Sequence, residues 1–214
     1  MKNAGGWKAA NGGCARPKTN WSVFRNCLCL NFAGALGFPT AEYQNSGAFI
    51  RTKNFTRGVL NFEPAAYLVG DDEDYVTNYE AFQEFGEGIA DQYVELLLMD
   101  AFCRNADRHT YNYGLLRDQK TSQVLSMAPN FDHNIALVAR GYDDSPRKSD
   151  LMMEFLVELE GQTHAVSRYL SRHPKPIITP ELIAQGCIQT GMTVDVDYVQ
   201  QFVMAGYKVL DEIC

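Results

Sequence analysis

The sequence lacks the long apolar runs that mark membrane proteins. It also lacks the paired cysteines that mark many structural zinc sites. No apolar stretch approaches the ~20 residues that a helix needs to cross a membrane, and the first residues contain no apolar core of a signal peptide. The six cysteines form no CxxC pair, which favours reduced side chains that pack as small apolar groups. We therefore expect a cytoplasmic protein that does not insert into membranes.

Positive charge is also scarce. The chain has 19 Lys and Arg against 26 Asp and Glu, and its formal net charge is -7. Nucleic-acid phosphates select basic surfaces, so this balance argues against direct nucleic-acid binding. The acidic run at 71–74 is interpreted as a solvated loop. With 214 residues, 46% of them hydrophobic, the chain is long enough for one well-buried core or for one lobe with a small appendage.

Three side chains suited to phosphate chemistry lie in the segments NADRHTYN and APNFDHN. Asp107 and Asn112 are five positions apart, and Asp132 follows a short segment with the pattern of a hairpin. Phosphoryl transfer needs one carboxylate to orient the attacking hydroxyl, and a carboxamide and a second carboxylate to hold magnesium on the nucleotide phosphates. The pattern is therefore typical of a phosphoryl-transfer site.

The same two segments resemble the catalytic core of the HipA-like kinases and, more distantly, that of the phosphatidylinositol kinases, which also write the loop as DRHxxN. The resemblance is close from about Leu96 to Leu137 and looser upstream, in FAGALGFPTAEY. It implies an α+β fold of the protein-kinase type, with a truncated or divergent mixed small lobe at 1–75 and a mainly helical large lobe at 76–214. It also implies ATP and magnesium as cofactors and a protein Ser/Thr hydroxyl as acceptor.

The resemblance gives each side chain of the motif a role. Asp107 is expected to accept or orient the proton of the acceptor hydroxyl. Asn112 and Asp132 are the expected magnesium ligands. His109 would either stabilise charge on the transferring phosphate, as a second catalytic group, or hold the loop by a hydrogen bond.

Neighbouring residues are expected to support this loop. Arg108 should fix it by pairing with a carboxylate, and Asn105 should act as scaffold beside it. Asn134 would add a polar contact near the metal. No glycine follows Asp132, where the chain continues with His133. The conformational switching of a DFG motif therefore cannot be transferred to this chain.

The nucleotide-binding side of the resemblance is incomplete. A kinase of this fold uses a strand lysine on the donor phosphates, a helix glutamate that orients it and a glycine-rich loop above them. The two Gly-Gly pairs near the N-terminus are not spaced as GxGxxG, and residues 22–30 contain no Asp or Glu. Lys8 is the remaining candidate for the phosphate lysine, with Lys18 behind it. We expect either a fragment without most of its ATP-binding lobe or a divergent member with a different phosphate grip.

Hydrophobic periodicity predicts the elements around these motifs. Residues 89–104 show the clearest helical spacing, with one buried face, and lead directly into the loop. Strands at 113–117 and 123–127 flank a polar turn, so one hairpin would bring Asn112 and Asp132 to its two open ends. The other expected elements are helices at 22–36, 149–160, 164–171, 180–190 and 196–213, strands at 40–43 and 48–52, and an irregular stretch over the first twenty residues.

Two other functions stay open on the sequence. The chain could be a catalytically weak or inactive kinase-lobe remnant that binds nucleotide or a protein partner. It could also be a metal-dependent phosphohydrolase, but such sites use several His ligands, and only His109 and His133 lie near the motif. The oligomeric state is not indicated.

Overall fold

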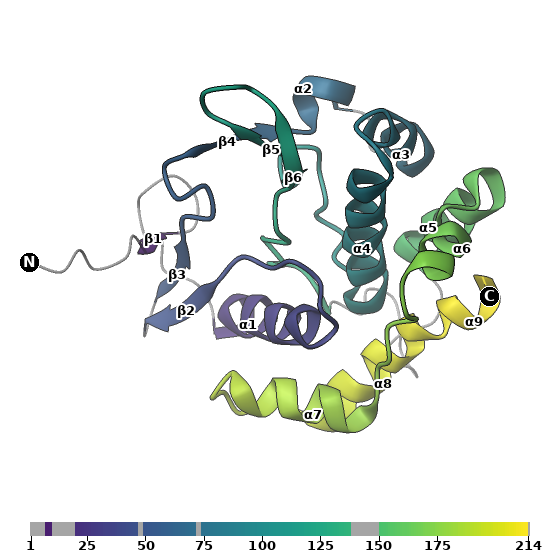
Figure 1. Ribbon diagram of the computed structural model, residues 1–214. Coiled ribbons are helices and arrows are strands. Elements are labelled where there is room, and N and C mark those ends of the chain that lie inside the picture. The colour runs from purple at the N-terminus through teal and green to yellow at the C-terminus, as the bar shows by residue number, and fades with distance from the viewer. Residues whose placement is uncertain (1–6, 10–19, 47–48, 72–73, 138–149, 214) are drawn as a thin grey trace, which may run out of the picture.

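A computed structural model describes residues 7–9, 20–46, 49–71, 74–137 and 150–213. They form a mixed α+β arrangement in which strands gather in the first two thirds of the chain and helices fill the remainder (Figure 1). The strands are β1 (Trp7–Ala9), β2 (Tyr43–Ser46), β3 (Phe49–Lys53), β4 (Leu60–Pro64), β5 (Gly114–Asp118) and β6 (Val124–Met127). The helices are α1 (Asn20–Ala35), α2 (Ala66–Val69), α3 (Tyr75–Gln83), α4 (Glu87–Cys103), α5 (Leu151–Thr163), α6 (Ala165–Arg172), α7 (Pro180–Gln189), α8 (Val196–Tyr207) and α9 (Val209–Ile213).

The first sheet has the order β1-β3-β2 and is antiparallel throughout. Its central strand, β3, places Thr52 opposite Lys8 on one side and opposite Tyr43 on the other. Helix α1 packs against β2, and Figure 1 shows it beside this sheet. The sheet thus places β1 in one layer with β2, the strand against which α1 packs. Helix α1 is the helix expected at 22–36.

The second sheet has the order β4-β5-β6, and the β5-β6 hairpin confirms the hairpin expected after Asn112. Strand β4, which was not predicted, pairs with β5 and places Pro64 opposite Gly114. A Cβ at Gly114 would lie 2.1 Å from the backbone oxygen of Glu63, so only glycine permits this approach of the two strands. The expected division at residue 75 stays a prediction, and β4 pairs across it.

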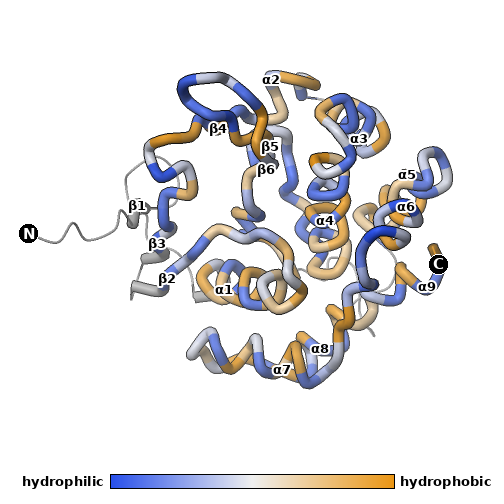
Figure 2. Tube along the Cα trace, in the orientation of Figure 1, coloured by the Kyte–Doolittle hydropathy of each residue, from blue (hydrophilic) through white to orange (hydrophobic). Residues whose placement is uncertain are grey.

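Helix α4 forms the centre of the core. Thirteen of its 17 residues are buried, so the expectation of a single buried face was wrong. The reason is that α3, α5, α6, α8 and β6 all pack around it, which removes any solvent-facing side along most of its length. Figure 2 shows the corresponding concentration of hydrophobic residues on α4. The helix that leads into the motif is thus the most enclosed element described.

Most other predicted helices are confirmed within a few residues. The structure differs from the expected elements at a strand, at the last helix and at two short helices. Thr40 and Ala41 were expected in a strand with Tyr43, yet β2 begins only at Tyr43. The reason is that Ala41 donates a backbone hydrogen bond to Asn130 (2.9 Å), in a bridge to another part of the chain. The last predicted helix is divided at Lys208 into α8 and α9. The short elements α2 and α3 were not predicted.

Several expectations concern chain ends and loops. Strand β1 lies in the stretch expected to be irregular, and the rest of that stretch, 1–6 and 10–19, lies outside the described residues. Asp74, expected in a solvated loop, caps α3 by accepting a hydrogen bond from the Thr77 amide (2.7 Å). No helix of the described ranges is long and apolar enough to span a bilayer. The cysteines that the structure describes carry free thiols, as expected: Cys27, Cys29, Cys103 and Cys187.

Candidate active site

The loop that carries DRHTYN begins at the end of α4. Arg104 takes a left-handed conformation (φ 49°) and ends the helix, and the Asn105 amide donates a hydrogen bond to the Asp100 carbonyl (3.0 Å). The Asn105 side chain donates to the Asp100 carboxylate (3.0 Å) and, at 3.4 Å, to the carbonyl of Asp132. Asn105 is therefore loop scaffold, as predicted, and Asp100 anchors both the backbone and the side chains at this turn.

Arg108 joins the two halves of the motif. Its guanidinium is buried and makes two hydrogen bonds to the Asp100 carboxylate, Nε to Oδ2 at 2.7 Å and Nη2 to Oδ1 at 2.9 Å. Its Nη1 donates to the carbonyls of Asn112 (3.0 Å) and Phe131 (2.9 Å). The predicted carboxylate partner is confirmed. One side chain thus holds the ends of the β5-β6 hairpin together.

Burial by itself would lower the pKa of the Arg108 guanidinium, but the charge and hydrogen bonds of Asp100 outweigh it and raise that pKa. Arg108 is therefore a permanent buried cation. His133 lies fully buried beside it, with Nε2 3.5 Å from Arg108 Nη2. Burial and the Arg108 charge hold the pKa of His133 well below its ordinary value, so its ring is neutral.

Asp107, His109 and Asn112 differ in how far they are exposed to solvent. The Asn112 side chain is buried, and its Nδ2 donates to the Asp107 carbonyl (3.0 Å), which leaves the carboxamide oxygen for a cation. His109 is exposed, and its Nδ1 accepts a hydrogen bond from the Tyr111 amide (3.3 Å). A loop-holding contact therefore exists for His109, without deciding between its two expected roles. Asp107 is half-buried and faces a small cavity of about 80 Å³, lined by Tyr75, Ala106, Asp107, Arg108, His109, Met152 and Phe155.

Asp132 occupies a left-handed backbone conformation (φ 58°), which Asp tolerates better than most residues. Its amide donates to the hydroxyl of Tyr43 on β2 (3.1 Å). Its Oδ1 accepts a hydrogen bond from the side-chain amide of Asn134. The first sheet thus holds the backbone of Asp132, and Asn134 holds its carboxylate.

The remaining candidate, Lys8, lies on β1, where only its backbone is described. It is in register with Thr52, which pairs on its other side with Tyr43, the residue that contacts Asp132. Adjacent strands are ~4.8 Å apart, so two strand spacings separate the backbone of Lys8 from the backbone of Tyr43. Lys18 lies outside the described residues. Helix α1 contains no Asp or Glu, so the helix carboxylate expected from the resemblance has no counterpart there.

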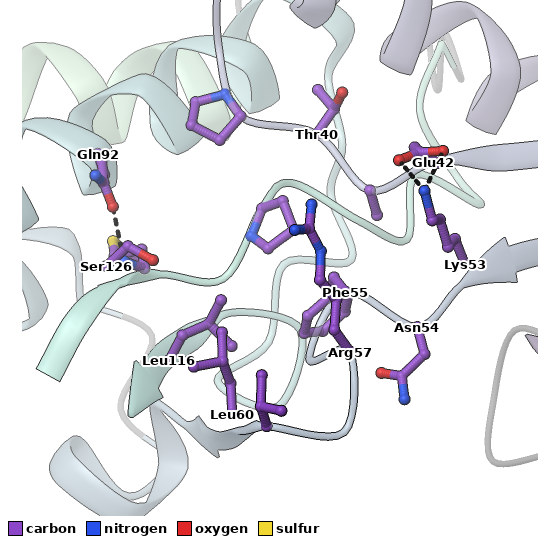
Figure 3. Close-up of a pocket in the computed structure, with 15 residues that line it drawn as sticks. Thr40, Glu42, Lys53, Asn54, Phe55, Arg57, Leu60, Gln92, Leu116 and Ser126 are labelled. Carbon is purple, nitrogen blue, oxygen red and sulfur yellow. Dashed lines mark hydrogen bonds and ion pairs between the residues drawn. The ribbon is translucent and has the colours of Figure 1, made fainter. Parts of the chain in front are cut away.

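A groove of about 470 Å³ lies beside the linker from β3 to β4 (Figure 3). Gln92 lines the groove, and its side-chain oxygen accepts a hydrogen bond from the Met127 amide (2.7 Å). Phe55 lines it and packs on Phe131, with ring centroids 5.6 Å apart, while Asp107, Asn112 and Asp132 are not among its lining residues. No sequence signal pointed to this groove. It adjoins the segment that carries Asp132, through the contact of Phe55 with Phe131, and does not include Asp132 itself.

The donor set suits magnesium. Among the described residues, no three His, Cys, Asp or Glu side chains are grouped to hold a metal ion. Magnesium bound to a nucleotide needs no such group, because it takes one or two protein oxygens, the phosphates and water. The Asn112 carboxamide oxygen and the Asp132 carboxylate supply hard oxygen ligands of this kind.

No known protein-family pattern matches the chain, and no curated protein matches its sequence. Solved structures do match. The Helicobacter pylori proinflammatory kinase CtkA matches with a TM-score of 0.55 at 12% identity, over 94% of this chain and 91% of that chain. HipA of Shewanella oneidensis MR-1, solved with HipB and operator DNA, matches with a TM-score of 0.57 at 13% identity, over 89% of this chain and 57% of that chain.

At such low identity the likeness shows the fold. It agrees with the α+β arrangement, with small antiparallel sheets and a helical large lobe around α4. The chain therefore has the fold of the HipA-like kinases that the DRHTYN and FDHN segments indicated.

Proposed function

We propose that the chain is an ATP-dependent phosphotransferase that uses magnesium and phosphorylates a protein Ser or Thr hydroxyl. The observation that carries the proposal is Arg108, which hydrogen-bonds the carbonyls of both Asn112 and Phe131. It ties the residue beside Asp132 to the loop that holds Asp107. A catalytic carboxylate and two magnesium ligands then belong to one rigid unit.

In this proposal the chain positions groups and balances charge, which is most of what catalyses phosphoryl transfer. Asn112 and Asp132 hold the cation, which when bound would neutralise charge on the donor phosphates. Asp107 orients the acceptor hydroxyl and takes up its proton. Lys8 contacts the donor phosphates from β1, whose backbone lies two strand spacings from that of Tyr43 on β2.

The acceptor would approach through the small cavity that Asp107 lines. Its other walls include Tyr75 of α3 and Phe155 of α5, so the hydroxyl reaches the carboxylate from the helical side. Of the two proposed magnesium ligands, Asp132 lies beside the first sheet, where its amide donates a hydrogen bond to the Tyr43 hydroxyl.

Calorimetry with ATP tests the proposal. The unaltered chain should bind ATP more tightly with magnesium than without it, and Asp132→Asn should weaken this magnesium-dependent part, because a neutral carboxamide attracts the cation less strongly than a carboxylate does. Asn keeps the tolerance for the left-handed backbone of Asp132, so the fold should persist. Asp197→Asn, at an exposed position on α8, is the matched control and should bind as the unaltered chain does. Magnesium-dependent affinity that is unchanged in Asp132→Asn would remove Asp132 from the metal site.

A second function is favoured by one observation, the lack of any Asp or Glu in α1. Without a helix carboxylate the phosphate lysine is poorly oriented, so the chain would bind nucleotide and transfer phosphate slowly or not at all. Magnesium-dependent ATP binding without any phosphate transfer would identify this binding module. No ATP binding under either condition would contradict both functions.

A further inference from the structure

Helix α1 presents three polar side chains to the segment that carries Asp132. Ser22, Arg25 and Asn26 are three and four positions apart, so they lie on one face of the helix. Ser22 and Asn26 are buried, at 9% and 2% exposure, among apolar neighbours of the core. Buried polar groups are costly unless they are hydrogen-bonded. Their partners therefore show what this face is for.

All three side chains bond to residues that follow Asp132. Ser22 Oγ donates to Asn134 Oδ1 (2.7 Å), and Asn26 Nδ2 donates to the same oxygen (3.1 Å). Asn26 Oδ1 accepts from the His133 amide (2.9 Å), and Arg25 Nη1 donates to the Asn134 carbonyl (3.0 Å). Both the backbone and the side chain of Asn134 are consequently fixed by α1.

The Asn134 side chain passes this fixation to the metal ligand. With its carboxamide oxygen receiving two hydrogen bonds from α1, its Nδ2 is left to donate to Asp132 Oδ1. The hydrogen bonds found for the Asp132 carboxylate within the described ranges involve Oδ1, so Oδ2 remains for a cation. A hydrogen bond of this kind orients a ligating carboxylate and tunes its affinity for metal.

We infer that Asn134, held by Ser22 and Asn26, is a positioning residue that sets the magnesium affinity of Asp132. The inference rests on the proposed function, because it assumes that Asp132 binds magnesium. It gives α1 a role in the site that does not depend on a glutamate. A shift or rotation of α1 would move the Asn134 amide and, through it, the carboxylate, so the position of the helix would regulate metal binding.

The direct test is a magnesium titration at fixed ATP concentration, monitored by calorimetry. It compares the unaltered chain with the variants Asn134→Ala and Ser22→Ala. Loss of a side chain that orients a metal ligand typically weakens metal binding about 10- to 100-fold. We expect Asn134→Ala to raise the magnesium concentration at half-saturation by roughly tenfold, and Ser22→Ala to raise it by less, because Asn26 still holds the same oxygen. ATP affinity without magnesium should not change in either variant.

Two further variants separate positioning from folding. Ser22→Thr keeps the hydroxyl donor and should restore the magnesium response that Ser22→Ala loses. Asn31→Ala removes a polar side chain of the same helix, one that contacts Gly186 of α7 (3.5 Å) instead of the metal segment, and should leave the titration unchanged. Unfolding by urea, measured on every variant, shows whether each remains folded.

The outcomes are distinguishable. If the unaltered chain requires magnesium and Asn134→Ala has the same half-saturation point within twofold, the inference is wrong while the proposed function stands. If Asn31→Ala shifts the titration as much as Asn134→Ala does, the effect belongs to helix packing and the inference is also wrong. If the unaltered chain shows no magnesium-dependent ATP binding, the proposed function fails and the inference fails with it.

Discussion

Asp100 and Arg108 form a buried ion pair, with 0% and 2% of their side chains exposed, that links the end of α4 to the DRHTYN loop and to Phe131. The two charges face each other through paired hydrogen bonds, the geometry in which a carboxylate holds a guanidinium best. The loop that carries Asp107 is therefore fixed from inside the core and not from solvent. Loss of either partner would leave the other charge buried without compensation.

This relationship predicts a large stability change. Asp100→Asn should lower the free energy of unfolding by about 3 kcal/mol, because breaking one side of a buried pair leaves an uncompensated charge. Urea denaturation followed by circular dichroism measures it. Lys53→Met, which breaks the exposed pair with Glu42, is the control and should cost less than about 1 kcal/mol. Equal effects of the two substitutions would show that Arg108 does not depend on Asp100.

Gly114 gives a second stability prediction. Gly114→Ala would place a methyl group 2.1 Å from the Glu63 carbonyl oxygen, so β4 and β5 must separate at that point. We expect a loss of roughly 3 kcal/mol or more, as for overpacking of a close contact. Urea unfolding also measures this loss. Gly161→Ala in α5, which has open space around the added carbon, should instead stabilise by about 0.5–1 kcal/mol. An unperturbed Gly114→Ala variant would contradict the close strand approach.

The sequence predicted those parts of the site that depend on local patterns. Arg108 and the hairpin after Asn112 were predictable because their spacing and turn residues are confined to one short stretch. The partner of Arg108 was not, because Asp100 belongs to a helix whose apolar spacing masks a buried carboxylate. Strand β4 was missed for a related reason: its edge position depends on pairing with a strand more than fifty residues later.

The contact between α1 and Asn134 joins residues more than one hundred positions apart. Their sequence shows only Ser and Asn within a helix, which by themselves indicate nothing about a metal segment. The absence of an acidic residue in α1 was evident from the sequence, but the polar face that reaches the site was not. Hydrogen bonds between uncharged side chains far apart in the chain leave no periodic pattern in the sequence. Only the folded structure shows them.

Asp91 on α4 predicts a dependence of stability on pH. Burial by itself would raise the pKa of its carboxyl group, but hydrogen bonds and charge from Arg172 and His173 outweigh burial and hold that pKa below its ordinary value. The Asp91 carboxylate lies 2.8 Å from His173 Nε2 and also bonds the Arg172 guanidinium. Because the native state binds a proton less readily than the unfolded state does, this contribution is present above about pH 4 and is lost below it.

The test is the free energy of unfolding at several pH values for the unaltered chain and for Asp91→Asn. The difference between them should be about 1 kcal/mol at pH 7, because Arg172 is partly exposed to solvent, and should shrink as pH falls through about 4 toward 2. Glu80→Gln, at an exposed position within α3, serves as the control, and its free energy of unfolding should differ from that of the unaltered chain by less than about 0.5 kcal/mol at every pH. A difference that stays constant with pH would show that Asp91 contributes through packing and not through its charge.

The rate of phosphate transfer by this chain should be low. The described structure offers no helix carboxylate in α1 to orient a phosphate lysine, so the donor phosphates should be poorly positioned. We expect the 214-residue chain to transfer the γ-phosphate of ATP slowly or not at all, measured as phosphate incorporated into the chain itself. Any transfer that occurs should stop in Asp107→Asn, because the acceptor hydroxyl loses its proton acceptor with almost no change in shape.

The control for the last substitution is magnesium-dependent ATP binding, which Asp107→Asn should retain because the proposed metal ligands are Asn112 and Asp132. A variant that binds but does not transfer would assign Asp107 to the chemical step. Transfer that survives Asp107→Asn would show that another residue accepts the proton. Fast transfer by the unaltered chain would show that the donor phosphates are oriented without a carboxylate on α1. Their orientation would then have to come from Lys8 and from Asp132, whose carboxylate Asn134 holds.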